Sequence, residues 1–135
     1  MISAEVTIQV QFFDLDPMQV VWHGNYARYL EEARCALLDA IGYNYPEMAD
    51  SGFMWPIVDM RLKYVRPCRF GQRIRVTATL AEYENRLRID YRITDAQSGE
   101  VLTKAQTTQV AVDAKTMDLC LESPAALQDR VRAKL

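Results

Sequence analysis

The chain has 135 residues, of which half are hydrophobic and a quarter are charged, as expected of one globular domain that buries a core. Its net charge of −2 gives no reason to expect a nucleic acid as the main partner, and no apolar run approaches the roughly 18 residues of a membrane span. The N-terminus has no signal-peptide pattern, so we expect a cytoplasmic protein without membrane insertion. Three widely spaced cysteines and a single histidine predict neither a disulfide framework nor a metal site.

The first half of the chain predicts a strand, a loop and a long helix. Residues 4–13 alternate between apolar and polar side chains, which indicates a half-buried strand. Residues 13–24 form a loop that holds two carboxylates, a proline, a glycine and the only histidine. Residues 26–41 follow helical spacing, with Asn25 as the expected N-cap and Gly42 in the position after the helix where a positive φ costs glycine little.

This helix has a wide apolar face that suits close packing on a sheet. Its members recur at spacings of three and four: Tyr26, Leu30, Ala33, Leu37 and Ile41. On the wetter side we expect two charge pairs, Arg28 with Glu32 and Glu31 with Arg34.

The second half predicts strands joined by short turns. Residues 43–53 form a connector with a short helical turn, and Ser123 and Pro124 are expected to open a C-terminal helix as N-cap and first helical residue. Four strand patterns lie between them, at residues 56–64, 73–84, 87–93 and 101–113. Short turns favour an antiparallel, meander-like order. We therefore predict an α+β fold in which an antiparallel sheet of about five strands wraps around one long central helix.

The loop and the start of the helix resemble a known family. Residues 16–26, DPMQVVWHGNY, followed by residues 29–34, YLEEAR, are similar to the signature of the hotdog-fold acyl-CoA thioesterases. The nearest groups are the 4-hydroxybenzoyl-CoA thioesterases and the Tol–Pal-associated acyl-CoA thioesterases. The Asp-x6-His-x2-Tyr spacing is the specific part, and weaker matches follow at residues 42–43, 55–58, 64–67 and 70–72. The resemblance covers nearly the whole chain and implies a single hotdog domain over residues 1–135.

The resemblance also implies a reaction and a set of site residues. It implies hydrolysis of an acyl-CoA thioester to a free acid and a thiol without a cofactor, by a homodimer or a dimer of dimers (a homotetramer) with sites at the dimer interface. Asp16 matches the family's catalytic carboxylate. The backbone N–H of His23 falls where the family polarises the thioester carbonyl, and its side chain matches the histidine of the Tol–Pal-associated group. The substrate-binding positions implied are Gln19, Trp22, Gly24, Asn25, Tyr26, Arg66 and Arg69.

Two positions depart from the family pattern. Gln19 stands where the family usually has glycine, in a tight loop beside the site, which leaves substrate range and activity open. Gln72 stands where the turn usually carries aspartate, which we interpret as a local matter of the turn.

Several residues have a structural interpretation beside the functional one. Asp16 can attack the thioester or act as a base for water, or it can be a turn aspartate before Pro17. His23 can orient Asp16 or the substrate, protonate the leaving thiolate, or be a structural histidine. Asp14 would share one side of an extended stretch with Asp16, and a solvated or turn-stabilising role is favoured for it.

A basic cluster surrounds the turn at Pro67. Its members, Lys63, Arg66, Arg69 and Arg73, can hold the phosphates of CoA or form a solvated charged rim.

We therefore predict an acyl-CoA thioesterase. Two alternatives remain: a hotdog hydratase or dehydratase acting on acyl thioesters, and a non-catalytic acyl-CoA-binding subunit made inert by Gln19. The sequence leaves open the acyl group, CoA against acyl-carrier protein, and dimer against tetramer.

Overall fold

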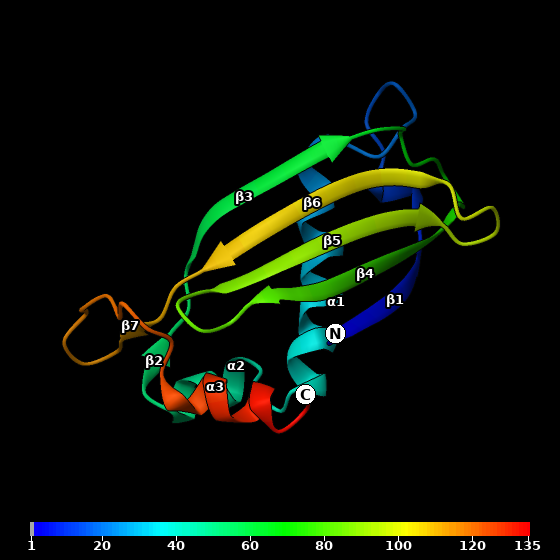
Figure 1. Ribbon diagram of the computed structural model, residues 1–135. Coiled ribbons are helices and arrows are strands. Elements are labelled where there is room, and N and C mark those ends of the chain that lie inside the picture. Colours follow the sequence, from blue (N-terminus) through cyan, green and yellow to red (C-terminus); the bar gives the residue numbers. More distant parts are fainter. Residues whose placement is uncertain (1) are drawn as a thin grey trace.

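The computed structural model describes residues 2–135 and confirms the α+β architecture (Figure 1). Three α-helices, two 3-10 helices and seven strands follow in the order β1 (Ser3–Gln9), η1 (Phe12–Asp14), η2 (His23–Asn25), α1 (Tyr26–Ala40), α2 (Tyr45–Asp50), β2 (Phe53–Met54), β3 (Ile57–Tyr64), β4 (Arg73–Glu82), β5 (Leu87–Asp95), β6 (Val101–Gln109), β7 (Val112–Asp113) and α3 (Ala125–Arg132). Over residues 2–135, no helix is both long and apolar enough to span a membrane.

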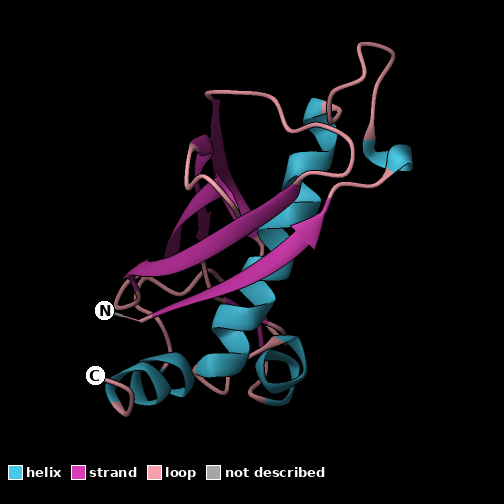
Figure 2. Cartoon of the chain, turned by 90° about the vertical axis from the view of Figure 1, so that its right-hand side faces the viewer, coloured by secondary structure: helices cyan, strands magenta, loops and turns pink. Residues whose placement is uncertain are grey.

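The main sheet has five antiparallel strands in the order β1-β4-β5-β6-β3, and α1 lies along one of its faces (Figure 2). Strands β4, β5 and β6 form the predicted meander. The meander does not extend to β3, which lies at the far edge beside β6. Residues 65–72 therefore cross the end of the sheet from one side to the other, rather than forming a tight turn between neighbouring strands (Figure 1).

The predicted apolar face of α1 is confirmed as the centre of the core. All five of its predicted members are buried, and Leu30, Ala33 and Leu37 have no exposed surface. The predicted pair of Glu31 with Arg34 is confirmed, with a Glu31 carboxylate oxygen 4.0 Å from the Arg34 guanidinium. The expected location of Arg34 on the wetter side is wrong, because its stem is buried against the sheet. Its guanidinium donates to the hydroxyl groups of Tyr45 at 3.0 Å and Tyr91 at 3.4 Å, which lie closer than Glu31.

The remaining predictions on charge pairs and helix caps have different outcomes. Arg28 and Glu32 form no ion pair within residues 2–135. Gly42 follows α1 with φ of 72°, as predicted. Asn25 does precede the first residue of α1, but its side chain makes no capping hydrogen bond.

Two predictions near the C-terminus are corrected. Pro124, not Ser123, is the N-cap of α3, because the first helical hydrogen bonds, from the N–H groups of Leu127 and Gln128, go to the Pro124 carbonyl. The Ser123 hydroxyl is buried without a partner. The strand predicted over residues 101–113 is broken after Gln109, and its last part pairs with β2 as a separate two-stranded sheet.

Strand β3 connects two different ends of the molecule (Figure 1). Its first residues lie beside the small β2–β7 sheet, and its last residues lie beside the loop that connects β1 to α1. The candidate site is at this second end.

Candidate active site

The loop that holds the motif, residues 11–25, is fastened to α1 through Asp14. Its buried carboxylate accepts from the Gln11 backbone N–H and from the Tyr29 hydroxyl, both at 2.9 Å. Its carbonyl accepts from the Trp22 N–H at 3.0 Å and from the Asn25 side-chain amide at 2.8 Å. Burial and the Asp14 carboxylate raise the pKa of Tyr29, so its hydroxyl stays protonated as a donor. Asp14 therefore has the turn-stabilising role favoured from the sequence, but in a buried setting.

Asp16 opens a tight turn at the tip of the loop. Its carbonyl accepts from the Gln19 N–H and its own N–H donates to the Val20 carbonyl, both at 2.9 Å. One carboxylate oxygen, Oδ1, accepts from the Met18 N–H at 2.8 Å. Among residues 2–135 the other oxygen, Oδ2, has no hydrogen-bond donor. The turn thus fixes the direction of the carboxylate while leaving one oxygen open.

Gln19 occupies the position where this turn requires a left-handed backbone. Its φ is 63°, a conformation that glycine adopts without cost and that strains other residues. Its side chain is exposed and does not line the cleft described below. The departure from the family's glycine therefore changes the strain of the turn more than the shape of the site.

The backbone at His23 begins η2, which leads directly into α1. In the described part of the chain, the N–H groups of His23 and Gly24 have no acceptor, as is usual for the first N–H groups of a helix. The His23 carbonyl accepts from the Tyr64 hydroxyl at 3.1 Å, which ties this peptide to the end of β3. Such open N–H groups at a helix start can bind an oxyanion.

Asp16 and His23 open on the same cleft, which has a volume of about 230 Å³. The other side chains that line it are mostly apolar or aromatic: Met18, Val20, Val21, Tyr26, Tyr64, Val65, Arg66 and Pro67. The cleft is therefore a small apolar space with one carboxylate and one imidazole at its edge.

Two tyrosines form the back of this cleft. Tyr26 is buried and lies edge-to-face against Tyr64, with ring centroids 5.0 Å apart. Its hydroxyl accepts from the Cys68 N–H at 3.3 Å, and burial raises the pKa of Tyr26. Tyr26 stays neutral at any working pH, so it contributes shape and polarity to the cleft rather than a proton.

Three other expected substrate-binding residues lie beside the cleft rather than in it. The Trp22 ring stacks at a tilt on the His23 imidazole, with centroids 5.3 Å apart. The same ring covers Gly24, where an added Cβ would lie 2.3 Å from a ring carbon. Asn25 is used to hold the Asp14 carbonyl. Gly24 and Asn25 therefore support the conformation of the loop and do not line the cleft.

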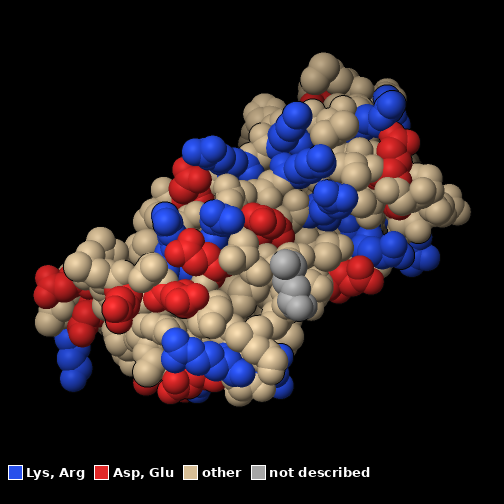
Figure 3. All heavy atoms as spheres, viewed as in Figure 1, with Lys and Arg blue, Asp and Glu red and all other residues tan. Residues whose placement is uncertain are grey.

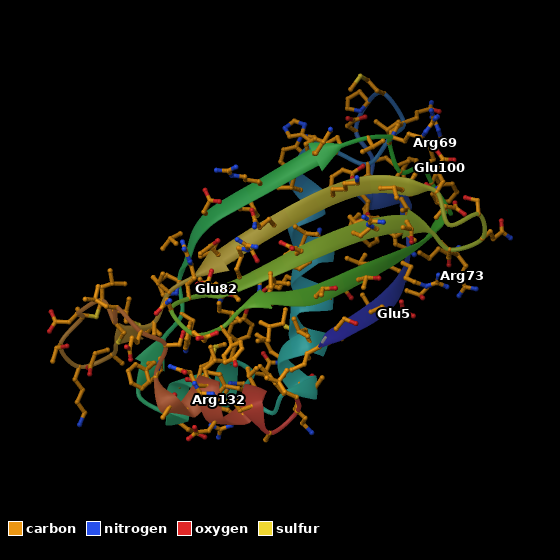
Figure 4. All side chains as sticks on the ribbon, in the orientation of Figure 1. Glu5, Arg69, Arg73, Glu82, Glu100 and Arg132 are labelled. Atoms are coloured by element: carbon orange, nitrogen blue, oxygen red, sulfur yellow. The ribbon has the colours of Figure 1, made fainter. Side chains whose placement is uncertain are left out.

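The basic cluster is spread over one end of the sheet. Lys and Arg side chains gather over the upper half of the face in Figure 3, whereas Asp and Glu gather at its lower left. Arg66 lines the cleft and forms an ion pair with Glu100 at 2.5 Å, and Arg69 lies beside this pair in the next groove (Figure 4). Arg73 lies farther along the edge of β4 (Figure 4). Of this cluster, Arg66 therefore lines the cleft itself, Arg69 lies in the adjoining groove that Arg66 also lines, and Lys63 lies on β3 next to Tyr64.

Gln72 has a structural use that explains the second departure. Its amide donates to Asp95 at 2.8 Å, and its carbonyl oxygen accepts from the Arg69 N–H at 3.0 Å. The Gln72 amide, with the N–H groups of Ser98 and Gln97, lowers the pKa of Asp95 to about 2. An aspartate at position 72 would place two carboxylates together here.

The residue that sequence reasoning missed is Tyr64. Its place on an alternating strand suggested only a core aromatic, yet its hydroxyl holds the His23 carbonyl and its ring lines the cleft. The fragment of residues 64–67 that resembles the family was the available signal. The contact itself depends on β3 lying at the edge of the sheet, which local patterns do not reveal.

Comparison with known proteins identifies the family of the chain. The family model described as the thioesterase-like superfamily matches residues 10–135. The chain belongs to the thioesterase-like superfamily. A candidate acyl-CoA thioesterase of Bacillus subtilis is 30% identical over 107 residues, which cover 78% of this chain and 77% of that protein. A candidate esterase of Synechocystis is 30% identical over 128 residues, which cover 94% and 77%.

Solved structures agree with the family. A 1,4-dihydroxy-2-naphthoyl-CoA thioesterase from Synechocystis superposes with a TM-score of 0.85 at 23% identity, and the match covers 96% of both chains. A protein from Thermus thermophilus superposes with a TM-score of 0.83 at 28% identity and covers 96% of this chain and 98% of that one. The hotdog fold expected from the motif is thereby confirmed, and the chain is a thioester hydrolase.

Proposed function

We propose that this hydrolase acts on acyl-CoA, that Asp16 supplies the reactive carboxylate, and that the His23 backbone N–H polarises the thioester carbonyl. The observation that carries the proposal is that an Asp16 oxygen and the His23 N–H, neither with a protein partner among residues 2–135, belong to residues that line the same apolar cleft. A carboxylate beside open helix-start amides is the combination that acyl transfer needs.

The chemistry follows from these groups. As the carbonyl carbon becomes tetrahedral, its oxygen gains negative charge, which the His23 N–H stabilises; one such donor is worth about 10²–10³-fold in rate. Asp16 either attacks the carbon, giving a mixed anhydride that water then cleaves, or takes a proton from an attacking water. In both routes the C–S bond breaks and the thiolate leaves with a proton. The His23 side chain is exposed and lines the cleft, and we assign its imidazole to supply that proton.

Tyr64 and Arg66 support this reaction without taking part in the bond changes. The Tyr64 hydroxyl fixes the His23 peptide, so we assign it as a positioning residue for the oxyanion donor. Arg66 at the cleft and Arg69 in the neighbouring groove offer charge for the phosphates of CoA. Arg66 must then share its guanidinium with Glu100.

We further propose that the enzyme is a homodimer formed through β3. This strand is an edge of the sheet with one side unpaired, and nearly all of its side chains are exposed on both faces. An open edge with several exposed apolar side chains, here Ile57, Val58 and Met60, favours pairing with another strand. If a two-fold axis passes through Met60, Asp59 lies opposite Arg61 of the partner subunit, a favourable cross-strand pair. A dimer of dimers and a cytoplasmic location stay predictions.

The test is thiol release from a panel of aliphatic and aromatic acyl-CoAs by the wild type and Asp16→Asn. We expect wild-type turnover and a loss of about 10²–10⁴-fold in the variant. A change in acyl unsaturation or hydroxylation without thiol release would identify a hydratase instead. Tight acyl-CoA binding with no turnover would identify a binding subunit.

A further inference from the structure

A second group of exposed apolar residues lies far from the site, on the hairpin that follows β6. We call residues 112–121 the apolar arm. The arm is firmly built: the Asp113 N–H donates to the Asp118 carbonyl at 2.9 Å, and the Asp113 carboxylate accepts from the N–H groups of Lys115 at 2.8 Å and Thr116 at 3.0 Å. A defined hairpin that turns its apolar side chains outward is expected to meet another surface.

The exposed fractions show how strongly the arm faces outward. Met117 is 63% exposed, Leu119 57% and Leu121 84%. Met117 forms the bend with φ of 63°, so its side chain is held at the tip rather than folded back. Met54, which pairs with Val112 at the base of the arm, is 41% exposed.

The arm cannot reach the site of its own chain. It is attached at the beginning of β3, whereas the cleft lies at the end of that strand (Figure 1). Eight residues of extended strand separate the two ends by about 26 Å. The cleft therefore receives nothing from the arm within one protomer.

Antiparallel pairing of β3 with the β3 strand of a second protomer removes this separation between arm and site. The beginning of each β3 then lies beside the end of the other, so each arm is carried to the other protomer's site loop. That loop presents exposed apolar side chains of its own, Met18 and Trp22 among them. The two apolar groups are unpartnered in one chain and complementary in the pair.

We propose that the apolar arm of one protomer forms the outer wall of the acyl pocket of the other, with Met117 and Leu119 of the partner subunit facing Met18. The volume of the cleft supports this, because about 230 Å³ is below the roughly 300–1,000 Å³ typical of sites for small organic ligands. The arm makes the pocket apolar on both sides, so it selects acyl groups without charge near the thioester. This proposal rests on the acyl-CoA thioesterase and the dimer proposed above.

The first experiment asks whether the arm touches the substrate. In Leu119→Asp, a charge would enter the apolar pocket, and we expect kcat/KM to fall at least tenfold for long apolar acyl-CoAs and less for acetyl-CoA. Leu135→Asp places the same charge on another exposed leucine, far from the arm in sequence, and should leave the profile unchanged. A Leu119→Asp profile that matches the control would overturn the proposal while leaving the thioesterase itself intact.

The second experiment asks from which subunit the arm comes. We would purify a doubly tagged heterodimer of an Asp16→Asn chain and a Leu119→Asp chain. The single active Asp16 then sits in a site covered by the unmodified arm, so we expect the wild-type acyl profile at half the wild-type rate. The Leu119→Asp profile in this heterodimer would show that the arm acts on its own chain, against the proposal.

A third measurement does not depend on turnover. In a Cys120→Ser background, Met18→Cys in one chain and Leu119→Cys in the other should be joined by a short bis-maleimide, whereas either variant alone should not give the linked heterodimer. Absence of the link in a protein that is dimeric in solution would overturn the proposal even if no acyl-CoA is hydrolysed.

Discussion

In the two halves of the site loop, the polar groups differ in how far the fold supplies their hydrogen-bond partners. Around Asp14, the carboxylate and carbonyl bond to Gln11, Trp22 and Asn25 within the loop and to Tyr29 on α1, and the side chain is buried. Around Asp16 and His23, one carboxylate oxygen and the His23 N–H have no partner within residues 2–135, and both residues line the cleft.

This difference is the reason that we propose a chemical role for Asp16 and a structural role for Asp14. Two residues apart, the pair shares a sequence context, but the first carboxylate is buried and its Oδ2 accepts two hydrogen bonds from the fold. Groups that the fold orients without using are available to a substrate.

The largest effect on stability is expected at Asp14. Asp14→Asn removes a buried charged acceptor from Tyr29 and leaves an amide N–H₂ without a partner, so the free energy of unfolding should fall by about 1.5–3 kcal/mol. Denaturant unfolding measures this. Tyr29→Phe is the matched control from the other side of the bond and should lose less. An unchanged midpoint in both variants would contradict the structural role of Asp14.

A gain in stability is expected at Gln19. Gln19→Gly relieves the left-handed strain at φ of 63° but adds freedom to the unfolded chain, so we expect a net gain of about 0.5–1 kcal/mol. Gln19→Ala keeps the strain and should show no gain. If Gln19→Gly also changes the acyl profile, the side chain reaches the substrate, against its exposed position away from the cleft.

A smaller effect on stability is expected at Gly24. Gly24→Ala would place a methyl group 2.3 Å from the Trp22 ring, which is half-exposed and can move aside. We expect less than about 1 kcal/mol of destabilisation, a changed Trp22 fluorescence and a raised KM, because the ring that stacks on His23 is displaced. Trp55→Phe removes the other tryptophan signal. Unchanged fluorescence and KM would show that the ring position does not matter.

The smallest effect is the pH dependence at Asp95, outside the loop. Its pKa is lowered to about 2 in the folded protein from an ordinary 3.8, with the Gln72 amide as the main cause. The stabilisation is therefore complete above pH 3.8 and is lost as the pH falls toward about 2. Asp95→Asn should melt below the wild type at pH 6, and the gap should close over this range. A gap that widens on acidification would contradict the assignment.

Local patterns predicted most of the fold, and the motif located the loop. The helix face at Leu30, Ala33 and Leu37 could be predicted because burial imposes a period on the sequence. Failures occurred where distant segments compete for the same group. The Ser123 backbone bonds to residue 84 outside the helix, whose hydrogen bonds begin at the Pro124 carbonyl, and Arg34 is buried against hydroxyls on other elements.

In the candidate site, too, local placements could be predicted and contacts between distant segments could not. Asp16, His23 and Tyr26 lie together at the cleft because they belong to one continuous segment. Tyr64 could not be placed there, because β3 crosses to the far edge of the sheet and the connection over residues 65–72 has the length of an ordinary turn.

The most direct test compares the two aspartates in one experiment, measuring both thiol release and unfolding for Asp14→Asn and Asp16→Asn. We predict that Asp16→Asn keeps nearly the wild-type midpoint and loses about 10²–10⁴-fold in kcat, whereas Asp14→Asn loses stability and keeps most of its kcat at a temperature where it is folded. If Asp16→Asn retains activity, or if both variants lose activity in proportion to stability, Asp16 is not the reactive carboxylate and the account is wrong.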